Sequence, residues 1–166
     1  MDTDIPFFGK PSRSQVYEQF GRAMELAQLF ETEVGTALLA LDAIERKSFI
    51  SPDPEAYKRL STAIAAQTLG RSLAQMKERL HLTEDLEQEF ASALKIRNHL
   101  AHRFFPDHGI RFLEESGQLE MLSRLKEACT TMQQAYTIAG NVAHALVKAV
   151  HQIRSHSSQL SAPDAI

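Results

Sequence analysis

The chain has 166 residues, 43% of them hydrophobic and 23% charged, and its formal net charge is −3. This length predicts one globular domain with its own core, and the negative net charge excludes a general electrostatic attraction to nucleic acid or to an anionic membrane. Seven glycines and six prolines favour helices over an all-β fold, and one cysteine excludes an internal disulfide. No run of about 18 apolar residues and no signal-peptide pattern is present, so we expect a cytoplasmic protein without a membrane partner.

The N-terminal third predicts an irregular leader followed by one long helix. Residues 1–13 include Pro6 and Pro11 and are predicted to be the leader. From about Ser14 to Lys47, apolar residues recur every three or four positions, at Val16, Phe20, Ala23, Ala27, Phe30, Val34, Leu38 and Leu41. This spacing predicts one apolar face of a long helix.

Two shorter helical regions are predicted next. The first covers residues 54–80, and its apolar stripe changes phase at Gly70, where we expect a kink or break. Thr83 is the predicted N-cap of the following helix. That helix is expected to reach about Phe104, because Pro106 cannot extend it.

The C-terminal part predicts a loop, a long helix and a tail. Residues 106–117 are expected to form the loop, with a short extended piece at residues 110–113. Apolar residues then alternate spacings of three and four to about residue 153, at Leu122, Leu125, Cys129, Met132, Tyr136, Ala139, Ala143, Leu146, Val150 and Ile153. Residues 156–166 contain several serines and are predicted to be a flexible tail.

The predicted fold is all-α, an up-and-down bundle of four to five helices with long first and last helices. One domain is expected to cover residues 14–155. The apolar spacing of about 3.5 residues predicts a left-handed, coiled-coil-like packing of the first and last helices. Part of this apolar surface is also suited to a contact between two chains.

Arg97 lies on the apolar face of the third predicted helical region. At about 100° per residue, six apolar residues fall within roughly 60° of it: Leu86, Phe90, Ala93, Leu94, Leu100 and Ala101. A guanidinium on such a face needs a partner or an open cleft. Two interpretations follow, a functional site or an ion pair with an acid of another helix, such as Glu25, Glu31 or Glu33.

Asn98 and His102 favour the functional site. They are four residues apart and therefore neighbours on the helix surface. Histidine titrates near neutral pH and is suited to proton transfer. Arg97 and His102 are about 140° apart on an undistorted helix, so they do not reach one small group together. This separation favours a site that a second subunit completes.

The surroundings of these residues are basic although the whole chain is acidic. The span from Lys95 to Arg111 contains four basic residues and one acid, Asp107. Clusters rich in arginine favour phosphate groups. Lys95, Arg103 and Arg111 are therefore predicted to bind substrate phosphates.

The nine residues 97–105, R-N-H-L-A-H-R-F-F, resemble the R-x4-6-H motif of the HEPN superfamily. HEPN domains are small helical bundles, which agrees with the bundle predicted for nearly the whole chain. Many of them are metal-independent ribonucleases, often toxins or defence effectors. They act as dimers in which the two motifs face each other across the two-fold axis.

The resemblance implies a role for each motif residue. Arg97 would bind the scissile phosphate, Asn98 would position the arginine, the phosphate or the histidine, and His102 would act as general base on the ribose 2′-hydroxyl or as general acid. The implied product is a 2′,3′-cyclic phosphate, formed without a metal ion or a nucleotide cofactor. The implied partners are an RNA substrate, a second copy of the chain and an antitoxin protein.

One position departs from the family pattern. Toxins paired with minimal nucleotidyltransferase antitoxins often carry a tyrosine, which the antitoxin modifies, two residues after the histidine. This chain has Phe104 there, which has no hydroxyl. An antitoxin of this chain is therefore expected to be of a different kind.

Other interpretations of the same residues stay open. One is a non-catalytic HEPN-like bundle that binds nucleotides or a protein, and another is a dimeric helical regulator in which Arg97 forms a structural ion pair. His99 is expected to be exposed without a role, and a metal site at His99 and His102 is disfavoured because no further ligand motif accompanies them. Cys129 is expected in the core.

Overall fold

The computed structural model describes residues 10–47 and 53–160. Within these ranges the chain forms six α-helices and one short 3-10 helix and contains no strand, so the predicted all-α class is confirmed. None of the helices in these ranges is long and apolar enough to cross a membrane.

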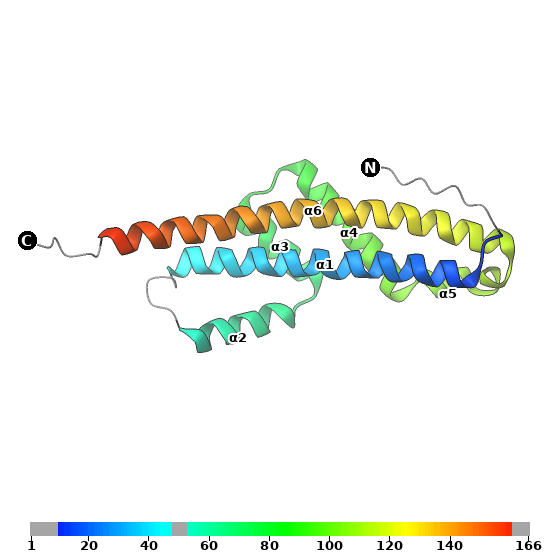
Figure 1. Ribbon diagram of the computed structural model, residues 1–166, viewed down its shortest axis with the longest axis horizontal. Helices are drawn as coiled ribbons and strands as arrows, with labels where there is room; N and C mark the ends of the chain where they lie inside the picture. Colours follow the sequence, from blue (N-terminus) through cyan, green and yellow to red (C-terminus); the bar gives the residue numbers. More distant parts are fainter. Residues whose placement is uncertain (1–9, 48–52, 161–166) are drawn as a thin grey trace, which may run out of the picture.

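Two long helices, α1 (Arg13–Arg46) and α6 (Glu115–Leu160), form the spine of the molecule. They run parallel, because the start of α1 packs against the start of α6 and the later parts of both helices also pack together (Figure 1). The apolar faces of the two helices therefore bury each other within one chain. The predicted bounds of α1 are correct to within one residue, since Ser12 forms a capping box with Gln15 and Lys47 ends the helix in a left-handed conformation.

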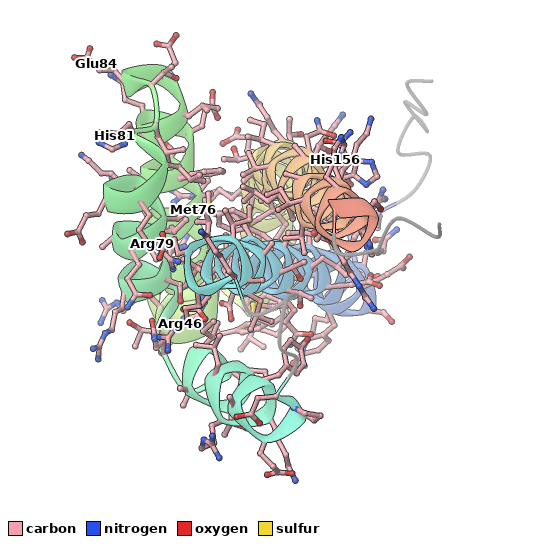
Figure 2. All side chains as sticks on the ribbon, turned by 90° about the vertical axis from the view of Figure 1, so that its left-hand side faces the viewer. Arg46, Met76, Arg79, His81, Glu84 and His156 are labelled. Atoms are coloured by element: carbon pink, nitrogen blue, oxygen red, sulfur yellow. The ribbon has the colours of Figure 1, made fainter. Side chains whose placement is uncertain are left out.

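The second predicted region is divided into α2 (Pro54–Ala65) and α3 (Leu69–Leu80). The break falls at residues 66–68, just before the expected position at Gly70, because the side chain of Thr68 accepts the Arg71 N–H and begins a new helix. In the end-on view of Figure 2, α2 lies apart from α6, whereas Met76 of α3 is fully buried.

Helix α4 (Glu84–His102) packs antiparallel to α1. Phe90 of α4 contacts Phe30, and Phe104, just beyond α4, contacts Phe20, with ring centroids 5.5 Å apart in both pairs. Thr83 caps the start of α4 as predicted, since its side chain accepts the Leu86 N–H. The helix that carries the motif is thus fixed along its length against α1.

The predicted loop at residues 106–117 is wrong, because this segment is helical. It consists of α5 (Phe104–His108), a 3-10 helix at Gly109–Leu113, called η1, and the start of α6. Pro106 is the third residue of α5, where its missing N–H costs no helical hydrogen bond. The expected extended piece at residues 110–113 is wrong as well, since burial of Phe112 folds this apolar run back onto the bundle.

Two hydrogen bonds and one close backbone approach stabilise the path of the chain from α5 through η1 into α6. Nδ1 of His108 donates a hydrogen bond to the Phe104 carbonyl (2.6 Å), and the Gln118 side chain donates to the Phe112 carbonyl (3.1 Å). A Cβ on Gly117 would lie 1.9 Å from the Arg111 carbonyl oxygen, so only glycine fits there. We call the segment from α5 to Gly117 the corner.

The ends of the predicted domain shift by a few residues. Helix α6 begins at Glu115 and runs to Leu160, so residues 156–160 of the predicted tail are helical. Residues 10–12 precede α1 without regular structure. The rest of the predicted leader and tail, residues 1–9 and 161–166, lies outside the described residues.

Candidate functional site

Arg97 lies in the penultimate turn of α4, facing α1. Its side chain is 28% exposed, and its Nε donates to Oε1 of Glu31 at 2.5 Å. Of the three acids considered as partners, Glu31 forms the ion pair, whereas no hydrogen bond or ion pair joins Glu25 or Glu33 to Arg97 among the described residues. The interpretation of Arg97 as half of an ion pair between two helices is thus supported by its contact with Glu31.

Asn98 is the second partner of Arg97. Nη1 of Arg97 donates to Oδ1 of Asn98 at 3.2 Å. A guanidinium carries five N–H donors, and these two contacts leave donors over for a ligand such as a phosphate. Glu31 and Asn98 together orient the guanidinium from two sides, while most of its polar edge is not committed to the protein.

His102 is the last residue of α4 and lies on the exposed surface. It has no hydrogen-bond or ion-pair partner in the described part of the chain. It lies one turn after Asn98 but does not contact Arg97, as the angular separation on the helix predicts. The structure thus brings Arg97 and Asn98 together and leaves His102 separate.

Two of the three predicted phosphate-binding residues are already paired. Arg103 forms an ion pair with Asp107 at 2.7 Å, and Arg111 forms one with Glu120 at 2.6 Å. Lys95 is exposed and has no partner among the described residues. The corner is therefore less basic than its sequence suggests, and Lys95 is the predicted cation that remains available.

Glu120 links the corner to α6. It accepts from Arg111 and also from Arg124, at 2.9 Å. Desolvation alone would raise the pKa of Glu120, but the two arginines outweigh it and hold this pKa below its ordinary value. Sequence reasoning missed Glu120, because the acid lies nine residues beyond Arg111, across a turn that was not predicted.

His99 is half-buried and has an ionisable partner, whereas the sequence predicted an exposed position without a role. Its Nε2 lies 3.2 Å from Oδ2 of Asp107, which also pairs with Arg103. His99 lines a cleft of about 480 Å³ between α4 and α6, together with Lys95 and Arg124. This cleft lies on the side of α4 away from Arg97.

The remaining polar groups give no second candidate centre. Within residues 10–47 and 53–160, no group of three or more histidine, cysteine, aspartate or glutamate side chains is placed to hold a metal ion. Cys129 is half-buried beside the core, and burial raises the pKa of its thiol against the opposing effect of Arg22. A thiol of this kind is a packing group and not an activated nucleophile.

Comparison with known protein families, with curated proteins and with solved structures finds no match to this chain. The candidate site is the region around Arg97 in the last two turns of α4. It combines a guanidinium oriented by a carboxylate and an amide with an exposed histidine one turn farther along the same helix. Such a set can bind an anion and transfer a proton.

Proposed function

We propose that the protein is a metal-independent RNA endonuclease of the HEPN type, acting as a toxin or defence effector. The observation that carries the proposal is the orientation of Arg97 by Asn98, one helical turn before the exposed His102, which has no hydrogen-bond or ion-pair partner among the described residues. An arginine with free donors suits a phosphodiester, and a histidine suits the proton transfers of its cleavage. The motif resemblance supports the same assignment.

In the proposed reaction, Arg97 binds a non-bridging oxygen of the scissile phosphate and stabilises the charge that develops there. One His102 takes the proton of the ribose 2′-hydroxyl while the 2′-oxygen attacks phosphorus. The bond from phosphorus to the 5′-oxygen breaks, and a second His102 gives its proton to that oxygen. The products are a 2′,3′-cyclic phosphate and a free 5′-hydroxyl. Lys95 lies on the side of α4 away from Arg97, so within one chain it does not reach a phosphate next to the one that Arg97 binds.

Two histidines require two copies of the chain. His102 and Arg97 do not touch within one chain, so a two-fold dimer that faces two α4 C-termini supplies the acid and the base. Exposed apolar side chains lie in the corner, which begins two residues after His102, namely Ile110 at 78% and Leu113 at 64% exposure. We assign these residues to the contact between the copies.

The proposed antitoxin does not act on the residue two positions after the histidine. Phe104 has no hydroxyl and is only 2% exposed, packed against Phe20 and His108. A modifying enzyme would reach neither a reactive group nor an accessible one there. The proposed antitoxin therefore covers the site as a binding partner.

The ion pair of Arg97 with Glu31 favours a second candidate, a non-catalytic helical module or regulator in which Arg97 only fastens α4 to α1. The two candidates differ in what removal of each side chain does. If Arg97 is structural, its loss lowers stability and the loss of His102 has no effect. If the site is catalytic, both losses abolish RNA cleavage in a folded protein.

The test compares the wild type with Arg97→Ala, Asn98→Ala and His102→Ala. We expect the wild type to cleave single-stranded RNA in EDTA, His102→Ala and Arg97→Ala to lose at least about a hundredfold in rate, and Asn98→Ala to lose less. Arg71→Ala and His144→Ala, on exposed positions of α3 and α6, serve as matched controls. A wild type without cleavage, or a His102→Ala variant as active as the wild type, rejects the proposal.

A further inference from the structure

The cleft of about 480 Å³ between α4 and α6 has an apolar floor. The buried side chains of Leu100, Phe104 and Ala128 line it beside the half-buried Ile96. The ring of His99, which also lines the cleft, stands edge-on to that of Phe104, with the ring centroids 6.1 Å apart. The volume is within the range of small-molecule sites. A ligand with an apolar body therefore has side chains to pack against in this cleft.

Two cations from different helices line the same cleft, Lys95 of α4 and Arg124 of α6. Lys95 is exposed, and its ammonium has no hydrogen-bond or ion-pair partner among the described residues. Arg124 donates from Nη2 to Glu120 at 2.9 Å, which leaves other N–H groups of the guanidinium over. The hydroxyl of Ser92 both donates and accepts, so it does not distinguish ligands by their charge.

One group of charges beside the cleft is not balanced. Glu120 forms ion pairs with Arg111 at 2.6 Å and with Arg124 at 2.9 Å, so a single carboxylate serves two guanidinium groups. These three side chains together carry one positive charge more than they compensate. Because Arg124 is the member of this group that lines the cleft, the excess positive charge faces a ligand bound there.

The other charges at the cleft cancel. Asp107 pairs through Oδ1 with Arg103 at 2.7 Å, and its Oδ2 lies 3.2 Å from Nε2 of His99, so this carboxylate is compensated even when the histidine is neutral. Glu127 lines the cleft, has no partner among the described residues and offsets Lys95. One uncompensated positive charge thus remains, which matches a ligand with a single negative charge.

Charge and floor together narrow the chemistry of the ligand. A cationic amine is repelled by the positive excess. A phosphate monoester carries about 1.5–2 negative charges near pH 7, more than the cleft compensates. An RNA backbone has ribose hydroxyls between its phosphates and no hydrocarbon to cover the floor. A carboxylate on a hydrocarbon chain meets both requirements, because it carries one charge at neutral pH and an apolar body.

We propose that this cleft binds a small organic carboxylate with a hydrocarbon body. The carboxylate contacts the side chains of Lys95 and Arg124, and the hydrocarbon packs on the apolar floor. Hydrogen bonds from charged donors to a carboxylate are stronger than those between neutral groups, so the two cations fix the orientation of the ligand. The site lies on the opposite side of α4 from the proposed RNA site and does not depend on it.

The test titrates the ¹⁵N-labelled full chain with octanoate, 1-octanol and octylammonium and follows the backbone amides of His99 and Ala128. The three probes share one hydrocarbon chain and differ in charge. We expect octanoate to bind at least about tenfold tighter than octanol, and octylammonium to bind more weakly than octanol. Octanol or octylammonium binding as tightly as octanoate would overturn the proposal.

Two exposed charges of the cleft should act in opposite directions. Lys95→Gln removes a contact to the carboxylate and should weaken octanoate binding severalfold, whereas Glu127→Gln removes a repelling charge and should strengthen it severalfold. Both positions are exposed, so neither change disturbs the core. Lys148→Gln and Glu78→Gln are the controls, since they change the net charge equally at exposed positions that do not line the cleft.

The variants also separate the proposed ligand from its alternatives. Octanoate affinity that neither Lys95→Gln nor Glu127→Gln changes would show binding to apolar surface alone and would overturn the proposal. Weaker binding in Glu127→Gln would contradict the charge count on which the ligand class rests. Tighter binding of adenosine 5′-monophosphate than of octanoate at the same amides would assign the cleft to RNA, and would overturn the proposal as well.

Discussion

Arg97 has two partners that constrain it in different ways. Glu31 fastens it to α1 by an ion pair, and Asn98 holds it from within α4. A guanidinium fixed at two points loses little further conformational entropy when a phosphate binds. The same pair can therefore stabilise the packing of α4 and prepare Arg97 for an anion.

We predict a small coupling energy between Arg97 and Glu31. Both side chains are about one third exposed, so solvent screens the pair, and a double-mutant cycle of Arg97→Ala and Glu31→Ala should give about 0.5–1 kcal/mol in urea denaturation. Glu33→Ala is the matched control, because this acid of α1 does not contact Arg97. A coupling equal to that of the control would show that the ion pair does not form in solution.

The thiol of Cys129 should react slowly in the folded protein. Burial raises its pKa, so less thiolate is present at pH 8 than in an exposed cysteine, and access is restricted as well. We expect iodoacetamide to alkylate the native protein at least about tenfold more slowly than the urea-unfolded chain. Equal rates in the two states would contradict the half-buried position of Cys129.

The sequence predicted the motif residues but not which contacts they make. The apolar spacing placed Arg97 toward the core, and the helical period separated it from His102. Glu25, Glu31 and Glu33 remained equivalent, because only the register of α4 against α1 decides which acid reaches Arg97. The partner of Arg103, Asp107, lies only four residues farther along the chain, whereas the partner of Arg111 depends on the path of the corner.

At the scale of elements, the corner differs most from expectation. The four residues Ile110–Leu113 are too few to show the spacing of three or four residues that identifies a helix. Because residues typical of turns surround them, the sequence favoured an extended piece. Burial of Phe104 and Phe112 determines its path instead. The long helices were predictable because many turns repeat one apolar face, and a single buried ring at a turn provides no such repetition.

Gly117 should be the least replaceable glycine of the corner. Gly117→Ala forces a Cβ against the Arg111 carbonyl, so we expect a loss of about 2–4 kcal/mol in the free energy of unfolding. Gly21→Ala is the control, because a Cβ there meets nothing within 4 Å in the middle of α1, and it should gain about 0.5–1 kcal/mol. Thermal denaturation followed by circular dichroism measures both. A Gly117→Ala variant as stable as the wild type would refute the close approach.

The whole molecule is a parallel pair of long helices with the shorter helices α2, α3 and α4 packed along it (Figure 1). The sequence predicted the two long helices and their packing from their shared apolar spacing. It did not predict that they run parallel, because the direction of the last helix depends on how many reversals the chain makes between them. The division of residues 54–80 into α2 and α3 supplies the additional reversal.

We predict that the protein is a dimer in solution. Light scattering coupled to gel filtration should give about twice the chain mass of 18.6 kDa. Ile110→Glu and Leu113→Glu place charges at the proposed contact and should give monomers, because desolvating an unpaired charge is costly. Tyr57→Glu, an equally exposed apolar position on α2, is the control. A monomeric wild type would contradict the proposed reaction, because that reaction uses one His102 from each of two chains.

The unequal lengths of α1 and α6 have a consequence for local unfolding. Helix α1 has 34 residues and α6 has 46, and because both start at the same end, α6 projects past its partner by about 18 Å of helix (Figure 1). Residues 151–156 in this projection are all exposed, whereas Met132, Ala135 and Ala139 are fully buried. Local unfolding of the last turns of α6 therefore breaks few side-chain contacts. Amide hydrogens there should exchange with solvent long before those of the helix interior, so protection should decline along one continuous helix.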